Sequence, residues 1–273
     1  MSNQLMNRLS VVALAGLLAA CGGGGEEAAP PAAKGAEAHK GAEPAKAEAP
    51  KAEEAAAGAY TVAAVADGGK VAGKVTLTGA APAAEEVEVT KDNATCGAKK
   101  TLEPIKAGAD GALANVVVWI DGITKGKDWT SKDGAIDQKG CEYSPHIQGV
   151  PQGGEFTVKN SDPVLHNIHA YTGEETLFNI AQPMQNQESK KKLSKAGPVE
   201  FKCDVHSWMH AWVFVAGSPY FAVTGADGTF SIADVPPGTY KAKAWQEKLG
   251  LQEMEVKVDA KGEAKADFAF AMK

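Results

Sequence analysis

The stretch that decides the fold is Val199-Glu-Phe-Lys-Cys-Asp-Val-His-Ser-Trp-Met-His-Ala-Trp-Val-Phe-Val215. Its first five residues alternate between apolar or thiol and charged side chains, which predicts a half-buried strand with Cys203 on the core side. Residues 211–215 are apolar and predict a second, more deeply buried strand. The short loop between these strands carries the thiol of Cys203, the imidazole of His206 and the thioether of Met209.

A further imidazole precedes this stretch, in Leu165-His-Asn-Ile-His169. With His166, the chain offers two imidazoles, one thiol and one thioether as ligands for a soft metal. A trigonal set of two His and one Cys with a weak axial Met is the blue-copper electron-transfer site. The sequence therefore predicts copper binding by His166, Cys203, His206 and Met209.

The order and spacing of these residues resemble the cupredoxin family, including its amicyanin-like members with the ligand loop Cys-x-x-His-x-x-Met. The resemblance spans roughly Cys141 to Gly217 and implies a Greek-key β-sandwich over residues 136–217. It implies one type 1 copper held strongly by His166, Cys203 and His206 and weakly by Met209. It also implies that Asn167 pins the ligand loop, and that the edge of His206 is exposed to solvent as the electron port.

Three other histidines leave alternatives open. His210 directly follows Met209 and could replace it as the axial ligand, because Cys203, His206 and His210 also have a ligand-like spacing. His169 is expected on the opposite face of its strand from His166 and is interpreted as structural. His146 has no partner nearby in the sequence and is placed outside the site.

The N-terminus resembles a bacterial lipoprotein signal: Arg8 precedes an apolar run over residues 9–20, which Cys21 closes. The run is too short for a stable transmembrane helix. We therefore expect a signal peptide over residues 1–20, lipidation of Cys21 and attachment to the cell envelope facing the periplasm. Gly22 directly after that cysteine favours the outer membrane.

Four cysteines are present, and export places them in an oxidising compartment. If Cys21 is lipidated and Cys203 binds copper, Cys96 and Cys141 remain for a disulfide by elimination. Their pairing requires Cα atoms within bridging distance, which the sequence alone does not show.

Residues 21–69 are rich in Ala, Pro, Lys, Glu and Gly and have few large apolar side chains, so we expect a disordered tether there. Strand patterns follow, with apolar alternation over residues 71–77, a buried run at 115–120 and a hairpin-turn signal at Ala226-Asp-Gly-Thr229. The chain is therefore predicted to be all-β.

The stretch from Val223 to Tyr240 resembles the carboxypeptidase-regulatory-like domains, which are small prealbumin-type β-sandwiches. The C-terminal region offers four or five strands and residues 70–135 offer two or three, whereas such a sandwich needs about seven. We therefore expect residues 70–135 and 218–273 to form one sandwich with the cupredoxin inserted in it. In the rival layout, the N-terminal strands extend the cupredoxin sheet.

These features predict a membrane-anchored, monomeric carrier of single electrons, working with an unidentified redox protein. Lys190-Lys-Lys192 is a basic run that could steer an acidic partner. The alternatives are a copper-delivery lipoprotein and a cell-envelope scaffold. We expect no enzymatic activity, because the chain has few further His ligands and lacks recognisable catalytic motifs. A net charge of -6 argues against nonspecific nucleic-acid binding.

Overall fold

The computed structural model describes residues 60–272, and this part of the chain is all-β, as predicted. Two β-sandwiches follow from the strand pairing. The only α-helix in the described part is the short α1, Asn93–Cys96. None of the helices within residues 60–272 has the length and apolar character needed to cross a membrane.

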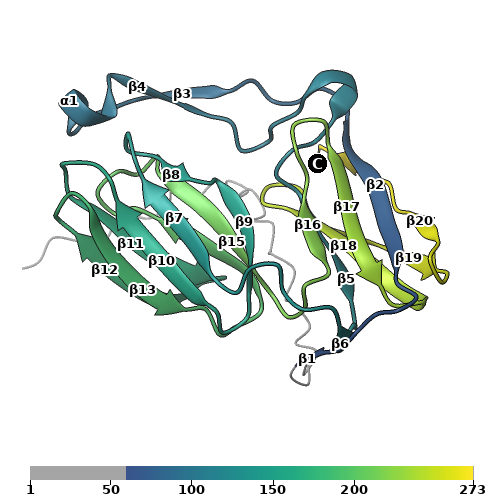
Figure 1. Cartoon of the computed structure of the whole chain (residues 1–273). Helices are drawn as coiled ribbons and strands as arrows, with labels where there is room; N and C mark the ends of the chain where they lie inside the picture. The colour runs from purple at the N-terminus through teal and green to yellow at the C-terminus, as the bar shows by residue number, and fades with distance from the viewer. Residues whose placement is uncertain (1–59, 273) are drawn as a thin grey trace, which may run out of the picture. The chain divides into compact units, whose positions relative to one another are not determined.

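The first sandwich has one four-stranded and one five-stranded sheet, in the orders β13-β10-β7-β8 and β12-β11-β14-β15-β9 (Figure 1). The strands of the first sheet are β7 Gly134–Gln138, β8 Tyr143–Ser144, β10 Glu155–Asn160 and β13 Gln187–Lys192. The strands of the second sheet are β9 Ile147–Pro151, β11 His166–Thr172, β12 Glu175–Gln182, β14 Gly197–Lys202 and β15 His210–Ala216. Their inward side chains form one continuous buried core.

The predicted alternation before the ligand loop is confirmed. Val199, Phe201 and Cys203 are buried, whereas Lys202 is exposed. β14 pairs with β15 and with β11, so residues 203–209 connect two paired strands beside the strand that begins at His166. The ligand loop is thus held at the end of a five-stranded sheet.

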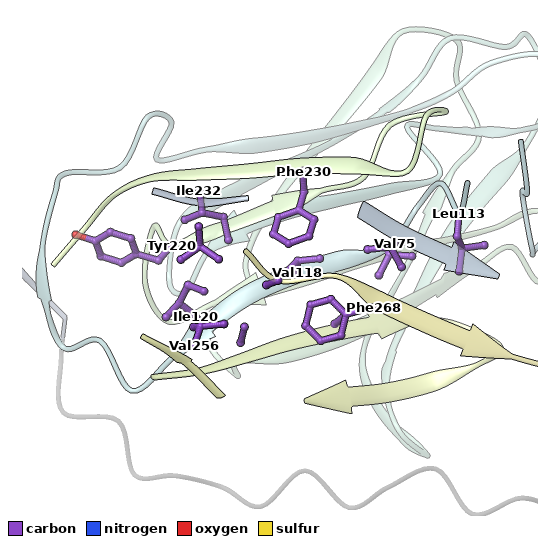
Figure 2. Close-up of a cluster of buried hydrophobic side chains, with 14 of the residues drawn as sticks. Val75, Leu113, Val118, Ile120, Tyr220, Phe230, Ile232, Val256 and Phe268 are labelled. Atoms are coloured by element: carbon purple, nitrogen blue, oxygen red, sulfur yellow. The ribbon is translucent and has the colours of Figure 1, made fainter. Parts of the chain in front are cut away.

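The second sandwich combines strands from both sides of the first in the sequence. Its sheets have the orders β16-β5-β18-β19 and β17-β2-β20, and β21 also pairs with β2. Its strands are β2 Gly69–Thr78, β5 Val117–Asp121, β16 Phe221–Val223, β17 Thr229–Val235, β18 Gly238–Gln246, β19 Gly250–Val258, β20 Glu263–Lys265 and β21 Phe268–Ala271. Figure 2 shows Val118 of β5 gathered with Val75, Phe230 and Phe268 in the core between these sheets.

The predicted hairpin at residues 226–229 is wrong, although the turn itself is present. The Gly228 N–H donates to the Gly225 carbonyl, but the turn joins β16, which pairs with β5, to β17, which pairs with β2. The chain therefore crosses between sheets. Thr224 explains the crossing, because its hydroxyl accepts from Val116 N–H and donates to the Leu113 carbonyl, which fixes the end of β16 beside β5.

An arm over residues 85–102 leaves the second sandwich after β2 and packs on the first. It consists of β3 Glu85–Glu88 and β4 Lys99–Leu102, paired antiparallel, with α1 at the tip. Figure 1 shows α1 and both strands extending along the first sandwich. Val89 and Cys96 of the arm belong to the first sandwich's core. The predicted disulfide is confirmed: Cys96 and Cys141 are bonded, with Cα atoms 5.1 Å apart.

The signal peptide, the lipidated Cys21 and most of the predicted tether lie outside the described residues. Within the stretch assigned to the tether, β1 Thr61–Val62 pairs in parallel with β6 Lys125–Gly126. Tyr60 packs against the second sandwich's core and donates a hydrogen bond to the Lys127 carbonyl. The ordered β structure therefore includes residues before Lys70.

Candidate metal centre

Three of the predicted ligands converge in the core of the first sandwich. His166 and His206 are 0% exposed and Cys203 is 3% exposed. The two Nδ1 atoms are 3.0 Å apart, and Nδ1 of His206 is 3.9 Å from Sγ of Cys203. All three donor atoms lie within 4.8 Å of one another. One ion can therefore contact all three.

The outer nitrogen of each imidazole is bound by a carboxylate. Nε2 of His166 lies 2.9 Å from Oδ2 of Asp162, and Nε2 of His206 lies 3.0 Å from Oδ2 of Asp92. Because an ionised carboxylate only accepts, each Nε2 carries the proton and each Nδ1 carries a lone pair. Two lone pairs that face each other at 3.0 Å can both bind one cation. The donor set therefore fits a metal ion.

Asp162 is itself held by the backbone. The N–H groups of Cys141 and Gly140 each donate to its carboxylate over 2.7 Å. Burial would raise the pKa of Asp162, but these backbone hydrogen bonds and the one from His166 hold it below its usual value. Burial lowers the pKa of His166 despite the attraction of Asp162. His166 is therefore a neutral imidazole, the form that binds metals.

Asn167 connects the strand of His166 to the ligand loop. Its Oδ1 accepts from the Asp204 N–H over 2.7 Å and lies 3.3 Å from Sγ of Cys203. Its Nδ2 donates to the carboxylate of Asp204 and to the side-chain oxygen of Asn179. These contacts hold the first residues of the loop against β11, which is the role that the resemblance implies for Asn167.

Met209 and His210 point to different surroundings. Met209 is 2% exposed and belongs to the same buried core as Cys203, and its N–H donates to the His206 carbonyl. His210 begins β15, where alternation directs it away from that core: its Nε2 lies 3.9 Å from Oε2 of Glu247. Met209, and not His210, therefore lies in the core that holds Cys203.

The prediction that the edge of His206 is exposed to solvent is wrong. The arm covers it, with Asp92 on its Nε2 and the sulfur of Cys96 3.8 Å from the same nitrogen. The disulfide to Cys141 holds the arm in this position. Trp208 packs beside the His206 ring and donates to the Cys141 carbonyl over 3.0 Å, so it is a buried packing residue.

Neither carboxylate belongs to the ligand pattern in the sequence. Asp162 stands four residues before His166, a spacing that could have marked it as a partner. Asp92 gives no such signal, because 114 residues separate it from His206.

His169 and His146 lie outside this centre. Nδ1 of His169 lies 3.1 Å from the carboxylate of Asp204, and its ring stacks on Tyr171 with the ring centroids 4.1 Å apart. His146 instead lies near His210 and Glu247.

Comparisons with known proteins give partial matches. The family model described as polysaccharide lyase family 4, domain II, matches residues 189–266. This range includes most of β13, then β14 and β15 of the first sandwich, and β16 to β20 of the second. This match gives no support to the resemblance to carboxypeptidase-regulatory-like domains, which stays a prediction. No curated protein matches the chain.

Among solved structures, a purple cupredoxin from Nitrosopumilus maritimus has 24% identity and a TM-score of 0.28, covering 31% of this chain and 100% of that one. Amicyanin from Paracoccus versutus has 17% identity and a TM-score of 0.29, covering 33% and 86%. A Cu-containing nitrite reductase from Thermus scotoductus SA-01 has 17% identity and a TM-score of 0.29, covering 33% of this chain and only 24% of its own. The functional assignment below therefore rests on the donor set and its surroundings.

Proposed function

We propose that the first sandwich is a cupredoxin-type domain that binds one copper ion and that the protein carries single electrons. His166 and His206 would bind through Nδ1 and Cys203 through Sγ, with Met209 as the weak axial ligand. The observation that carries this proposal is the convergence of two imidazole lone pairs and one thiol in a buried site. Copper in such a set supplies one-electron exchange between its two oxidation states.

The protein's own contribution is to fix the ligands. His166 begins a paired strand, and Cys203 directly follows another. Asp162 and Asp92 orient the two imidazoles by holding their Nε2 protons, and such outer partners raise ligand basicity. The burial of all three donors excludes water. A site with these features favours a carrier, because catalytic metal sites keep an open position.

Copper delivery fits the same residues less well. A delivery protein must release its metal, whereas both imidazoles here are held by carboxylates and His206 lies beneath a disulfide-anchored arm. We therefore infer slow metal exchange. Slow loss of copper to a chelator supports the carrier, and rapid loss supports delivery.

The proposed location is the cell envelope, facing the periplasm, with a lipid on Cys21 and preferably at the outer membrane. The Cys96–Cys141 disulfide supports export, since such bonds persist in oxidising compartments. The proposed partner is an unidentified redox protein, and the working protein is a monomer. Lys191 and Lys192 extend along exposed β13 beside Lys190, which pairs with Glu155, and they offer a basic docking edge.

Titration of the full chain with Cu(II), followed by visible absorption, tests the proposal. We expect an intense thiolate-to-copper band that saturates at one equivalent and disappears in Cys203→Ser. The matched control is His169→Gln, which removes an imidazole from the same strand outside the centre and should keep the band. A colourless protein, or equal bands in the wild type and Cys203→Ser, would reject the assignment.

A further inference from the structure

A second group of side chains with the chemistry of metal ligands lies where the two sandwiches meet. His146 lies between β8 and β9, His210 begins β15, and Glu247 lies in the turn between β18 and β19. One donor atom from each lies within 4.8 Å of the other two. Both imidazoles come from the first sandwich and the carboxylate from the second. This group contains no thiol.

The carboxylate is buried and shared. Glu247 has a side chain only 3% exposed, and its Oε1 lies 2.5 Å from Nε2 of His146. Its Oε2 lies 2.7 Å from the indole nitrogen of Trp212, which donates, and 3.9 Å from Nε2 of His210. A carboxylate in this position needs positive charge nearby, because burial of an unpaired charge is costly.

The imidazole of His210 faces the shared carboxylate. Nδ1 of His210 lies 3.2 Å from the Trp208 carbonyl, which can only accept, so Nδ1 carries the proton and Nε2 presents a lone pair toward Glu247. The rings of His146 and His210 meet edge to face with centroids 5.3 Å apart. Backbone pairing supports this arrangement, since the Trp212 N–H donates to the His146 carbonyl.

We propose that His146, His210 and Glu247 bind a divalent cation of the zinc type and that this ion links the two sandwiches. Two imidazole nitrogens and one carboxylate are a known zinc ligand set, in which a fourth position takes water or an external ligand. The His146 and His210 side chains are 29% and 24% exposed, so solvent reaches the group from their side.

The three side chains can accommodate such an ion after a small movement of the His146 ring. Zinc binds N and O ligands at about 2.0–2.2 Å, which places neighbouring ligand atoms about 3.3 Å apart in a tetrahedral site. The separation of 3.9 Å between His210 and Glu247 is close to this value. His146 must move away from Oε1, and the partial exposure of its ring allows that movement.

The competing interpretation is a metal-free cluster in which Nε2 of His146 donates a hydrogen bond to Glu247, so that hydrogen bonds alone join the sandwiches. Metal binding separates the two interpretations. Because the group lacks sulfur, Co(II) bound there should show weak d–d bands without thiolate charge transfer, in contrast to Co(II) at Cys203.

The test is a titration of the copper-loaded full chain with Zn(II) by calorimetry and with Co(II) by visible absorption. We expect one equivalent of Zn(II), weak Co(II) bands and an unchanged blue copper band. His146→Gln and Glu247→Gln should each weaken Zn(II) binding more than about 10-fold, since loss of outer partners alone costs about 10–100-fold. His169→Gln should bind Zn(II) as the wild type does.

Glu247→Gln removes a buried charge and its folding must be checked by circular dichroism. His146→Gln alters a partly exposed residue and decides the test if Glu247→Gln does not fold. Absence of a Zn(II) equivalent, or equal affinity in the wild type and His146→Gln, would overturn the proposal. Absence of the blue band with retained Zn(II) binding would reject only the copper assignment. A blue band without Zn(II) binding would reject only the zinc site.

Discussion

Oδ2 of Asp92 lies 3.0 Å from Nε2 of His206, although 114 residues separate them in the chain. The contact makes the arm over residues 85–102 part of the candidate copper centre. The arm leaves the second sandwich and is bonded to the first through Cys96 and Cys141. The arm thus brings a carboxylate to the candidate metal centre of the first sandwich.

Replacement of Asp92 tests this relationship. We expect Asp92→Ala to weaken copper binding about 10–100-fold, because loss of a carboxylate on a ligand imidazole has that cost. Asp92→Asn should lie between this variant and the wild type, since the amide oxygen still accepts a hydrogen bond. Competition with a chelator measures the affinity. Glu88→Gln, on the exposed part of the arm, is the control, and equal affinities in all four proteins would contradict the prediction.

Opening of the disulfide should release the arm. The bond joins residues 45 apart in sequence, so Cys96→Ser with Cys141→Ser should lower the free energy of unfolding by about 2–4 kcal/mol. Exposure of His206 should also speed oxidation of the Cu(I) protein by a small inorganic oxidant. Denaturant unfolding and stopped-flow absorption measure the two effects. An unchanged oxidation rate would show that the arm does not limit access.

Separate substitutions of Met209 and His210 can identify the axial ligand. Met209 lies in the core with Cys203, whereas His210 points toward Glu247. Met209→Gln should therefore change the electron paramagnetic resonance spectrum and the reduction potential more than His210→Asn does, because the axial ligand tunes the potential. The opposite order would make His210 the axial ligand.

The core beneath the centre depends on Phe201. It is 0% exposed and meets Phe156 edge to face, with ring centroids 5.3 Å apart. Phe201→Ala should destabilise the protein by about 3–5 kcal/mol through the loss of buried area and the cavity left behind. Met184→Ala, at a 69% exposed position, should change stability by less than about 0.5 kcal/mol. Denaturant unfolding compares them, and similar values would contradict the assigned core.

Acid should weaken the second sandwich partly through Asp267. The Lys265 ammonium and the Lys74 N–H hold the pKa of Asp267 below its usual value. A carboxyl group with a depressed folded-state pKa stabilises the fold above its unfolded pKa, near 3.9, and this contribution is lost as pH falls through the folded-state pKa. The group is 47% exposed, so the contribution is below about 1 kcal/mol. Asp267→Asn should flatten the dependence of unfolding free energy on pH in this range, and an unchanged slope would contradict the assignment.

Local patterns predicted the strands around the ligand loop, because the alternation at Val199, Phe201 and Cys203 directly reflects which side chains face the core. Elimination among four cysteines predicted the disulfide. These inferences needed only neighbouring residues or residue chemistry.

The arm could not be predicted in this way. Residues 85–102 carry charged side chains at many positions, and their few apolar residues pack on a sandwich that comes later in the chain. Distance along the chain also explains why Asp92 and Glu247 were not predicted as partners of His206 and His146, since more than 100 residues separate the two members of each pair. The wrong hairpin at residues 226–229 shows that a turn signal specifies a reversal but not which sheet receives the next strand.

The most direct test of the central claim is electron paramagnetic resonance of the full chain loaded with one equivalent of Cu(II), together with X-ray absorption at the copper edge. We expect a narrow copper hyperfine splitting and two nitrogens and one short sulfur bond around the copper, with the sulfur lost in Cys203→Ser. A wide splitting with only nitrogen and oxygen neighbours would contradict copper binding by Cys203 and with it the proposed electron carrier.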